Sequence, residues 1–357
     1  MTLVFDHRSL PQRILFGAGK AAEHLAAEVA RRGASRVMVI AENRDENREV
    51  ASGIEVARWY HEVVMHVPVE VAERARAVAA DEGIDLLVSI GGGSATGLAK
   101  AVALTTGLPF VAVPTTYAGS EATNVWGLTE DARKRTGVDD RVLPGTIVYD
   151  SHLMLTLPTE LAVSSGLNAL AHCVDALWAP RADPINAATA LEAVRALSSG
   201  LPRIVADPTD IDGRDEVLYG AYLAAVAFAS AGSGIHHKIC HVLGGTFDLP
   251  HAQTHATVLP YVVAFNAAAA PAASRRLADA LGADTAVDGL ADLWRRLQAP
   301  RALQDFGFQA GHVDEAVAIA LPAIPADNPR PVTTENLRAL IEAARIGADP
   351  AILLERE

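Results

Sequence analysis

Residues 84–101 read IDLLVSIGGGSATGLAKA and carry the strongest indication of the fold. An apolar segment rich in β-forming residues runs into three glycines, and a helical pattern opens directly after them. Glycine lets a backbone approach a phosphate closely, while a helix N-terminus supplies N–H donors and a favourable dipole. We therefore predict that Gly91, Gly92, Gly93 and Ser94 contact the pyrophosphate of a dinucleotide, with a plain turn as the alternative.

Strand-like and helix-like segments alternate on both sides of this stretch. Apolar segments predict strands at 36–43, 84–93, 109–116 and 146–151. Helical patterns precede the first of these at 20–33 and lie between later ones at 69–83 and 95–107. Such alternation is typical of parallel βαβ units. From about residue 160 the sequence is rich in Ala and Leu, helix-patterned and nearly free of strands. We predict an α/β dinucleotide-binding domain with a parallel sheet over residues 1–157, an all-helical substrate domain over 158–357, and a cleft between them.

Two further segments are candidates for nucleotide contacts. GAGKAA at 17–22 fits a dinucleotide-binding pattern, but the preceding QRILF is a poor strand, so a helix-entry turn is favoured there. PTTYAGSEATN at 114–124 places several hydroxyl groups after a strand, where open α/β sheets bind ligands. We expect Thr115, Thr116 and Ser120 to contact ribose or nicotinamide, with a solvated loop as the alternative.

Charge and composition exclude several classes of partner. The chain of 357 residues carries a net charge of −13 with a pI of about 5.4, which argues against nucleic acid and anionic membranes. Residues 217–235 carry no charge, but glycines and serines interrupt them, so a buried helix ending in a glycine-rich turn is favoured over a membrane span. The N-terminus lacks the features of a signal peptide, and two cysteines without a CxxC motif suit a reducing compartment. We expect a cytoplasmic protein.

Two histidine-containing segments carry the candidate chemistry. GLNALAH at 166–172 places Asn168 and His172 one helical turn apart, and GIHHKICHVLGGTFDLPHAQTH at 234–255 contains five histidines. An acidic residue at 168 would suggest a metal site, whereas asparagine is a neutral and weak ligand. His237 and His241 are also one turn apart and are the stronger site candidates. For His236 and His255 a role in the core or at the surface stays open.

The order and spacing of these motifs resemble the iron-containing alcohol dehydrogenase group of the dehydroquinate-synthase-like superfamily, from about Phe16 to Pro331. Within that group, GGGSATGLAKAVAL, SGLNALAH, HHKICHVLGGTFDLPHAQTHATVLPY and NPRP are most similar to the maleylacetate reductases. The resemblance implies a two-domain homodimer that uses NADH or NADPH to reduce the carbon–carbon double bond of maleylacetate. The product is 3-oxoadipate, in the breakdown of aromatic compounds.

The resemblance also assigns residues. Metal-binding members of the group place ligands at positions matching Asn168, His172, His237 and His251, and a histidine near the nicotinamide matches His241. The acidic ligand is missing here, and Gly97 stands where the alcohol dehydrogenases usually carry aspartate; both departures fit the maleylacetate reductases and disfavour alcohol oxidation. Reduction of a conjugated double bond forms an enolate, which ordinary donors can stabilise without a metal. We therefore expect no metal and a pocket that binds a small dicarboxylate and protonates its enolate, formed by His172, His237, His241, His251, Lys238 and Asn168.

The choice of cofactor and the roles of two peripheral residues are open to interpretation. Glu42, at the end of the second strand, can accept from a ribose 2′-hydroxyl and repel a 2′-phosphate, which favours NADH. Arg44 and Arg48 in the same loop weaken that expectation. Arg330 in NPRP either reaches a substrate carboxylate or forms a surface ion pair, and Lys134 either contacts the cofactor or belongs to a solvated run of charges.

Three alternative functions remain. The first is a metal-dependent alcohol or hydroxyacid dehydrogenase that uses iron or zinc held by three histidines and a water. The second is a dehydroquinate-synthase-like lyase, which the asparagine at 168 disfavours because such an enzyme needs a carboxylate in its metal set. The third is a dinucleotide-binding module without catalytic activity.

Overall fold

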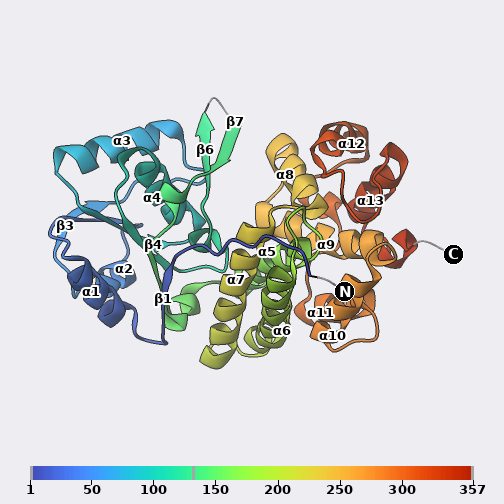
Figure 1. Ribbon diagram of the computed structural model, residues 1–357, viewed down its shortest axis with the longest axis horizontal. Helices are drawn as coiled ribbons and strands as arrows, with labels where there is room; N and C mark the ends of the chain where they lie inside the picture. The colour runs from blue at the N-terminus through green and yellow to red at the C-terminus, as the bar shows by residue number, and fades with distance from the viewer. Residues whose placement is uncertain (1–2, 131–132, 355–357) are drawn as a thin grey trace. The chain divides into compact units, whose positions relative to one another are not determined.

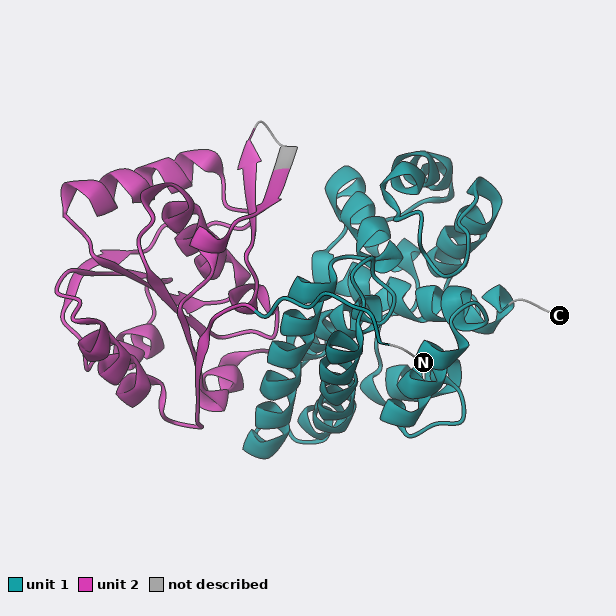
Figure 2. Cartoon of the chain, viewed as in Figure 1, with its two compact units in different colours: residues 1–9, 159–357 teal, residues 10–158 magenta. Residues whose placement is uncertain are grey.

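The chain divides into two compact units, which Figure 2 colours separately. The computed structural model describes residues 3–130 and 133–354, apart from the side chains of residues 133 and 134. The α/β unit comprises Leu10–Pro158, and the helical unit comprises Thr159–Glu357 together with the N-terminal segment up to Ser9. The change of unit after Pro158 lies next to the predicted boundary at residue 157, but the N-terminal segment belongs to the other unit.

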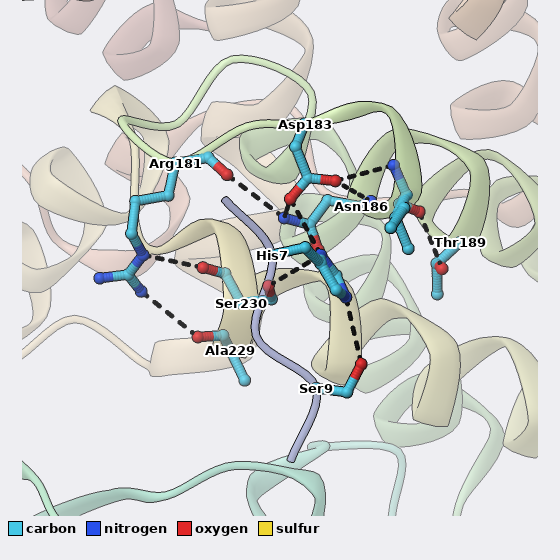
Figure 3. A network of polar contacts seen from close by, with 9 residues as sticks. His7, Ser9, Arg181, Asp183, Asn186, Thr189, Ala229 and Ser230 are labelled. Carbon is cyan, nitrogen blue, oxygen red and sulfur yellow. Dashed lines mark hydrogen bonds and ion pairs between the residues drawn. The ribbon is translucent and has the colours of Figure 1, made fainter. Parts of the chain in front are cut away.

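The N-terminal segment joins the helical unit because a buried carboxylate holds it there. His7 Nδ1 lies 2.9 Å from Asp183 Oδ2, and His7 Nε2 lies 3.2 Å from Ser9 Oγ (Figure 3). Asp183 also accepts from the backbone N–H groups of Ile185 and Asn186 and so caps a long helix. Burial opposes ionisation of Asp183, but these hydrogen bonds outweigh it and lower the pKa of the carboxyl group.

A parallel six-stranded sheet forms the centre of the α/β unit. Its strands, in spatial order, are β1 (Arg13–Phe16), β8 (Thr146–Tyr149), β5 (Phe110–Pro114), β4 (Leu86–Gly91), β2 (Val37–Ile40) and β3 (Val56–Tyr60). A separate antiparallel hairpin consists of β6 (Val125–Glu130) and β7 (Arg133–Val138) (Figure 1). Short 3-10 segments are η1 (Ser120–Ala122), η2 (Asp140–Val142) and η3 (Ser151–Thr156).

Helices cover both faces of the sheet, which explains why its central strands are largely apolar, although β4 contains the buried Ser89. The helices of this unit are α1 (Ala21–Arg32), α2 (Asp45–Val50), α3 (Val69–Asp81) and α4 (Gly93–Thr106). Successive side chains of β2 point to opposite faces: Met38 and Ile40 pack with α3 and α4, and Val37 and Val39 pack with α1 and α2. All four predicted strands and all three predicted helices of this unit are present. β3 and α2 were not predicted, and QRILF, which was interpreted as a poor strand, forms β1.

The helical unit is arranged around α5 (Thr159–Ala176), which packs against α6, α7 and α9. Every residue of α5 from Ala162 onward is buried, and these residues include the polar side chains of Asn168, His172 and Asp175. The other helices are α6 (Pro184–Ala206), α7 (Ile211–Ala231), α8 (Ile235–Phe247), α9 (His251–Ala267), α10 (Pro271–Leu281), α11 (Ala286–Leu297), α12 (Val313–Ala320) and α13 (Thr334–Ile346). The unit also contains η4 (Leu303–Phe306), η5 (Ala310–His312), η6 (Leu321–Ala323) and η7 (Pro350–Leu353).

The uncharged run that begins at Val217 forms most of α7, which ends at Ala231 before the turn at Gly232–Gly234, as predicted. Among the described residues, no single helix is long and apolar enough to cross a membrane. Only α7 and α8 taken together reach that length and composition, and they are bent by 100° relative to each other.

Candidate active site

The predicted nucleotide-binding residues lie at a switch point of the sheet. The chain leaves β2 toward β3 on one side, and it leaves β4 through α4 toward β5 on the other. Open α/β sheets bind ligands at the carboxyl ends of strands that flank such a point. Gly91 to Ser94 follow β4, and Glu42 follows β2, which pairs with β4 in the register Ile40 to Ser89.

The glycine turn leaves the N-terminus of α4 open. Gly92 is the N-cap, and no side chain among the described residues caps this helix there. A Cβ built on Gly93 meets no atom within 4 Å, so the backbone at this position can be approached closely. A Cβ on Gly92 would lie 2.9 Å from Thr116 Cγ2, which shows how tightly the loop after β5 packs against the glycines.

The other glycine pattern, at residues 17–19, is already occupied by a carboxylate of the chain itself. Asp150 Oδ1 accepts from the backbone N–H of Gly19 at 2.7 Å, and its Oδ2 accepts from that of Ala21 at 2.9 Å. These are the donors that a phosphate would need at the start of α1. The helix-entry turn favoured from the sequence is therefore the observed structure.

A buried lysine orders the hydroxyl-rich loop after β5. Lys100, on α4, donates from Nζ to the backbone oxygens of Thr123 at 2.9 Å and Val125 at 2.7 Å. Burial lowers the pKa of Lys100 to about 7, while Glu121 opposes the shift. The sequence analysis missed this residue, because a lysine in a helical pattern usually lies at the surface.

Thr115, Thr116 and Ser120 are all partly buried in this loop. The backbone N–H of Thr115 donates to Gly91 O at 3.1 Å, which ties the loop to the end of β4. Glu42 is exposed and forms an ion pair with Arg44 across 2.5 Å. The acidic group predicted to select NADH is thus already engaged by one of the arginines that weaken that prediction.

Six imidazoles of the helical unit form one cluster with His237 at its centre. Its ring centroid lies 5.0 Å from that of His172, with the rings nearly parallel, 4.8 Å from His255 and 6.0 Å from His241. His236 completes the buried part, and its Nε2 lies 2.9 Å from Nδ1 of His255. The ring of His251, the first residue of α9, lies 4.4 Å from His255. His236 and His255, whose role the sequence left open, therefore support the predicted site residues.

Asp175 is the residue that the sequence analysis overlooked. It lies on the same helix as Asn168 and His172, one turn beyond His172, and it is fully buried. Its Oδ2 lies 2.6 Å from His237 Nδ1. The signal in the sequence was an acidic residue at the end of an otherwise apolar helix, three positions after a candidate site residue.

Burial makes the interior of the cluster neutral. Removal from water lowers the pKa of His172 to about 4 and that of His236 to about 3, and neighbouring histidines add to both shifts. The pKa values of His237 and His255 are lowered well below the ordinary value for the same reasons. Burial raises the pKa of Asp175, although His236 and backbone N–H groups oppose this. At neutral pH these four imidazoles act as neutral groups.

Polar atoms in the interior are left for a ligand to satisfy. Asn168 Oδ1, His172 Nδ1 and His237 Nε2 are buried and have no hydrogen-bond partner within the described part of the chain. His241 and His251 are exposed, and Lys238 is partly buried. The site thus has a neutral interior and an edge that carries the groups able to meet an anion from solvent.

The structure bears differently on the two peripheral residues, Arg330 and Lys134. Arg330 donates to the backbone oxygen of Leu353 at 2.9 Å, and its guanidinium lies over the ring of Phe265 at 4.5 Å. It therefore stabilises packing within the helical unit through contacts that the sequence analysis did not anticipate. The side chain of Lys134 lies outside the described residues.

The α/β unit has an open glycine turn at the switch point of a parallel sheet, and the helical unit has a buried cluster of imidazoles. Together these features indicate an enzyme of the dehydrogenase class. The iron-containing alcohol dehydrogenase model matches residues 11–151, and the C-terminal model of the Fe-containing alcohol dehydrogenase family matches residues 162–345. The chain belongs to this family, and within it to the maleylacetate reductases, so it is an oxidoreductase.

Three relatives illustrate the similarity. The maleylacetate reductase of Sphingobium indicum is 44% identical over 354 residues, which are 98% of this chain and 99% of the relative. A crystal structure of maleylacetate reductase from Rhizobium sp. has a TM-score of 0.93 at 40% identity and covers 98% of this chain and 100% of that one. A crystal structure of an iron-containing alcohol dehydrogenase from Corynebacterium glutamicum has a TM-score of 0.98 at 65% identity and covers 99% and 100%.

Proposed function

We propose that this enzyme reduces the carbon–carbon double bond of maleylacetate to give 3-oxoadipate, with NADH or NADPH as the reductant and without a metal. The observation that carries the proposal is Asn168, a buried neutral residue at the position where metal-binding members of the family have an acidic ligand. The relatives named maleylacetate reductases support the choice of substrate. We further propose that the enzyme is a cytoplasmic homodimer.

The α/β unit offers the features that a dinucleotide needs. The open backbone at Gly93 and the free helix end at α4 suit a pyrophosphate, and Thr115, Thr116 and Ser120 offer hydroxyl groups on the next loop. Glu42 suits a ribose 2′-hydroxyl, with NADH favoured over NADPH. When bound, the cofactor supplies the hydride for the reduction.

The edge of the histidine cluster suits the two carboxylates of the substrate. Lys238, His241 and His251 lie on α8 and α9, where they are accessible to solvent at least in part. An aspartate at position 168 would repel a dianion across a buried site, where charges interact strongly. Asparagine removes this repulsion and can still donate a hydrogen bond.

The reduction requires the chain to stabilise one charge and deliver one proton. Hydride addition at the alkene carbon β to the ketone moves an electron pair onto the ketone oxygen as an enolate. A proton must then reach the α carbon. His241, which lies at the accessible edge one turn beyond His237, is our candidate for stabilising the enolate and passing on the proton.

A metal-dependent alcohol dehydrogenase is the second candidate, and one observation favours it. His237 is held by Asp175 through Nδ1 and leaves Nε2 without a partner among the described residues, as metal-binding histidines often do. Ligand atoms of His236, His237 and His255 also lie within 4.8 Å of one another, a spacing that could hold a metal ion. The site offers such an ion no free carboxylate, because Asn168 is neutral and the carboxylate of Asp175 is engaged by the backbone and by His237. We therefore assign no step to a metal.

The substitution Asn168→Asp separates the two candidates. Wild-type enzyme is expected to oxidise NADH with maleylacetate, to form 3-oxoadipate identified by mass spectrometry, and to leave NAD⁺ unreduced when iron or zinc and simple alcohols are added. Asn168→Asp should raise KM for maleylacetate and increase affinity for divalent metal, whereas Asn168→Ala should not bind metal more tightly. Alcohol oxidation by the wild type, with no turnover of maleylacetate, would refute the proposal.

A further inference from the structure

The carboxylate of Asp175 makes specific hydrogen bonds to the start of α8 and to His237. Its Oδ2 accepts from the backbone N–H of Gly234 at 2.9 Å and from that of His237 at 3.2 Å, and it meets His237 Nδ1 at 2.6 Å. Its Oδ1 lies 3.4 Å from the backbone N–H of His236. One carboxylate from α5 therefore caps the start of α8, which has no cap from the side chain of its own N-cap residue, Gly234.

We propose that Asp175 is a positioning residue that fixes His237 in the tautomer with hydrogen on Nδ1, so that Nε2 presents a lone pair to the site. A backbone N–H can only donate, so Oδ2, which meets two of them, acts there as an acceptor. His237 Nδ1 must then be the donor to the same oxygen. A neutral imidazole carries one N–H, which leaves Nε2 as an acceptor.

The ring of His237 is held in place as well as in tautomer. His172 stacks on it with an interplanar angle of 16°, and the ring of Phe228 lies 4.4 Å away. The buried Nε2 has no partner among the residues that the structure describes. A lone pair there repels a substrate carboxylate and attracts a hydrogen-bond donor, such as the hydroxyl of water or of an enol.

This inference rests on the proposed function and changes the role of one residue in it. His237 was predicted to help bind the anionic substrate. In the fixed tautomer it instead accepts a hydrogen bond from water or from an enol hydroxyl on the path of the proton. The groups that meet the carboxylates are then those at the accessible edge, Lys238, His241 and His251.

Gly234 provides independent support for the role of Asp175, because the absence of a side chain at Gly234 leaves space for the carboxylate. A Cβ built on Gly234 lies 2.7 Å from Asp175 Oδ1 and 3.1 Å from its Cγ. Any larger residue at this position must push the carboxylate away from the turn. Gly234→Ala therefore disturbs the same contact from the other side while it keeps the acid.

The tautomer can be read directly from the ¹⁵N resonances of the histidine rings in the full-length protein. We expect His237, assigned with His237→Gln, to show a protonated Nδ1 and a non-protonated Nε2 in the wild type. Asp175→Asn and Gly234→Ala should both populate the form with hydrogen on Nε2. Glu160→Gln, which removes an exposed acid from the same helix, serves as the matched control and should leave the spectrum unchanged.

Kinetics supply the second readout. Asp175→Asn is expected to lower kcat for maleylacetate about ten- to a hundredfold, as loss of such an orienting group often does, with little change in KM. A wild-type spectrum with hydrogen on Nε2 would overturn the inference, and so would an unchanged tautomer in both variants. A wild-type spectrum as expected in a protein that does not turn over maleylacetate would instead refute the proposed function. If Asp175→Asn fails to fold, the wild type and Gly234→Ala still decide the question.

Discussion

At the scale of single residues, the chemistry of the site depends on neighbours that a sequence does not display. The pattern of Asn168, His172, His237, His241 and His251 could be predicted, and the structure gathers the four histidines into one cluster. The neutrality of the two buried members, His172 and His237, could not be predicted, because their lowered pKa values follow from burial by helices distant in sequence. The same holds for the partner of His237, which lies on another helix.

His241 should affect the transition state more than substrate binding. If it stabilises the enolate or passes on the proton, His241→Ala should lower kcat on the order of a hundredfold while the variant still binds NADH. His251→Ala, which removes a group proposed to bind carboxylate, should mainly raise KM. Steady-state kinetics on both variants test this, with His152→Ala, an exposed histidine of the α/β unit, as the control. A His241→Ala enzyme with nearly normal kcat would show that the proton comes from elsewhere.

Glu42 should set the preference between the two cofactors. We expect kcat/KM to be higher with NADH than with NADPH, because the carboxylate repels a 2′-phosphate. Glu42→Gln should reduce this preference, since it also releases Arg44 from its ion pair. The ratio of kcat/KM values for the two cofactors is the measurement. A wild-type preference for NADPH would contradict the assignment.

At the scale of elements, the strand, glycine turn and helix of residues 84–101 were predictable because each part carries its own signal. β3 was missed because VARWY is partly exposed at the edge of the sheet and lacks an apolar run. The glycine turn after β4 was preferred because QRILF was interpreted as a poor strand, but Arg13–Phe16 forms β1 of the sheet. The physical reason for the outcome is Asp150, which fills the rival turn from a segment far along the chain.

Gly93→Ala tests the phosphate-binding role of that turn without disturbing the fold. The added methyl group meets no atom within 4 Å, and alanine favours a helix more than glycine does, so the melting temperature should not fall. The methyl group would occupy space needed by a pyrophosphate, so Kd for NADH should rise about tenfold, equivalent to about 1.4 kcal/mol. Gly311→Ala is the matched control, because a Cβ there is equally unhindered in the other unit. Unchanged NADH affinity in Gly93→Ala would contradict this role.

At the scale of the whole molecule, the two units should respond differently to acid. The lowered pKa of the buried histidines means that the unfolded chain binds protons that the helical unit excludes. Stability from His172 and His236 is therefore fully present above about pH 6.5. It is lost as the pH falls toward about 4 for His172 and about 3 for His236, at about 1.4 kcal/mol per pH unit for each group.

The α/β unit should stay folded at a lower pH than the helical unit. Burial opposes ionisation of Glu28, but hydrogen bonds from Arg31, Thr146 and Arg32 lower its pKa to about 2. Its contribution is present above the ordinary pKa of about 4.5 and is lost only as the pH falls toward 2. Hydrogen exchange between pH 7.5 and 5 should show the helical unit losing protection first, and His236→Gln should weaken that dependence. Equal protection of the helical unit across this range would contradict the prediction.

The most direct test of the central claim is the rate of NADH oxidation with maleylacetate, measured on one preparation before and after exhaustive chelation, with metal content determined by elemental analysis. We expect an unchanged rate and less than stoichiometric iron or zinc, because Asn168 and neutral histidines form a site that is proposed to work without a metal. Stoichiometric metal, together with a rate that is lost on chelation and restored when the ion is added back, would contradict it.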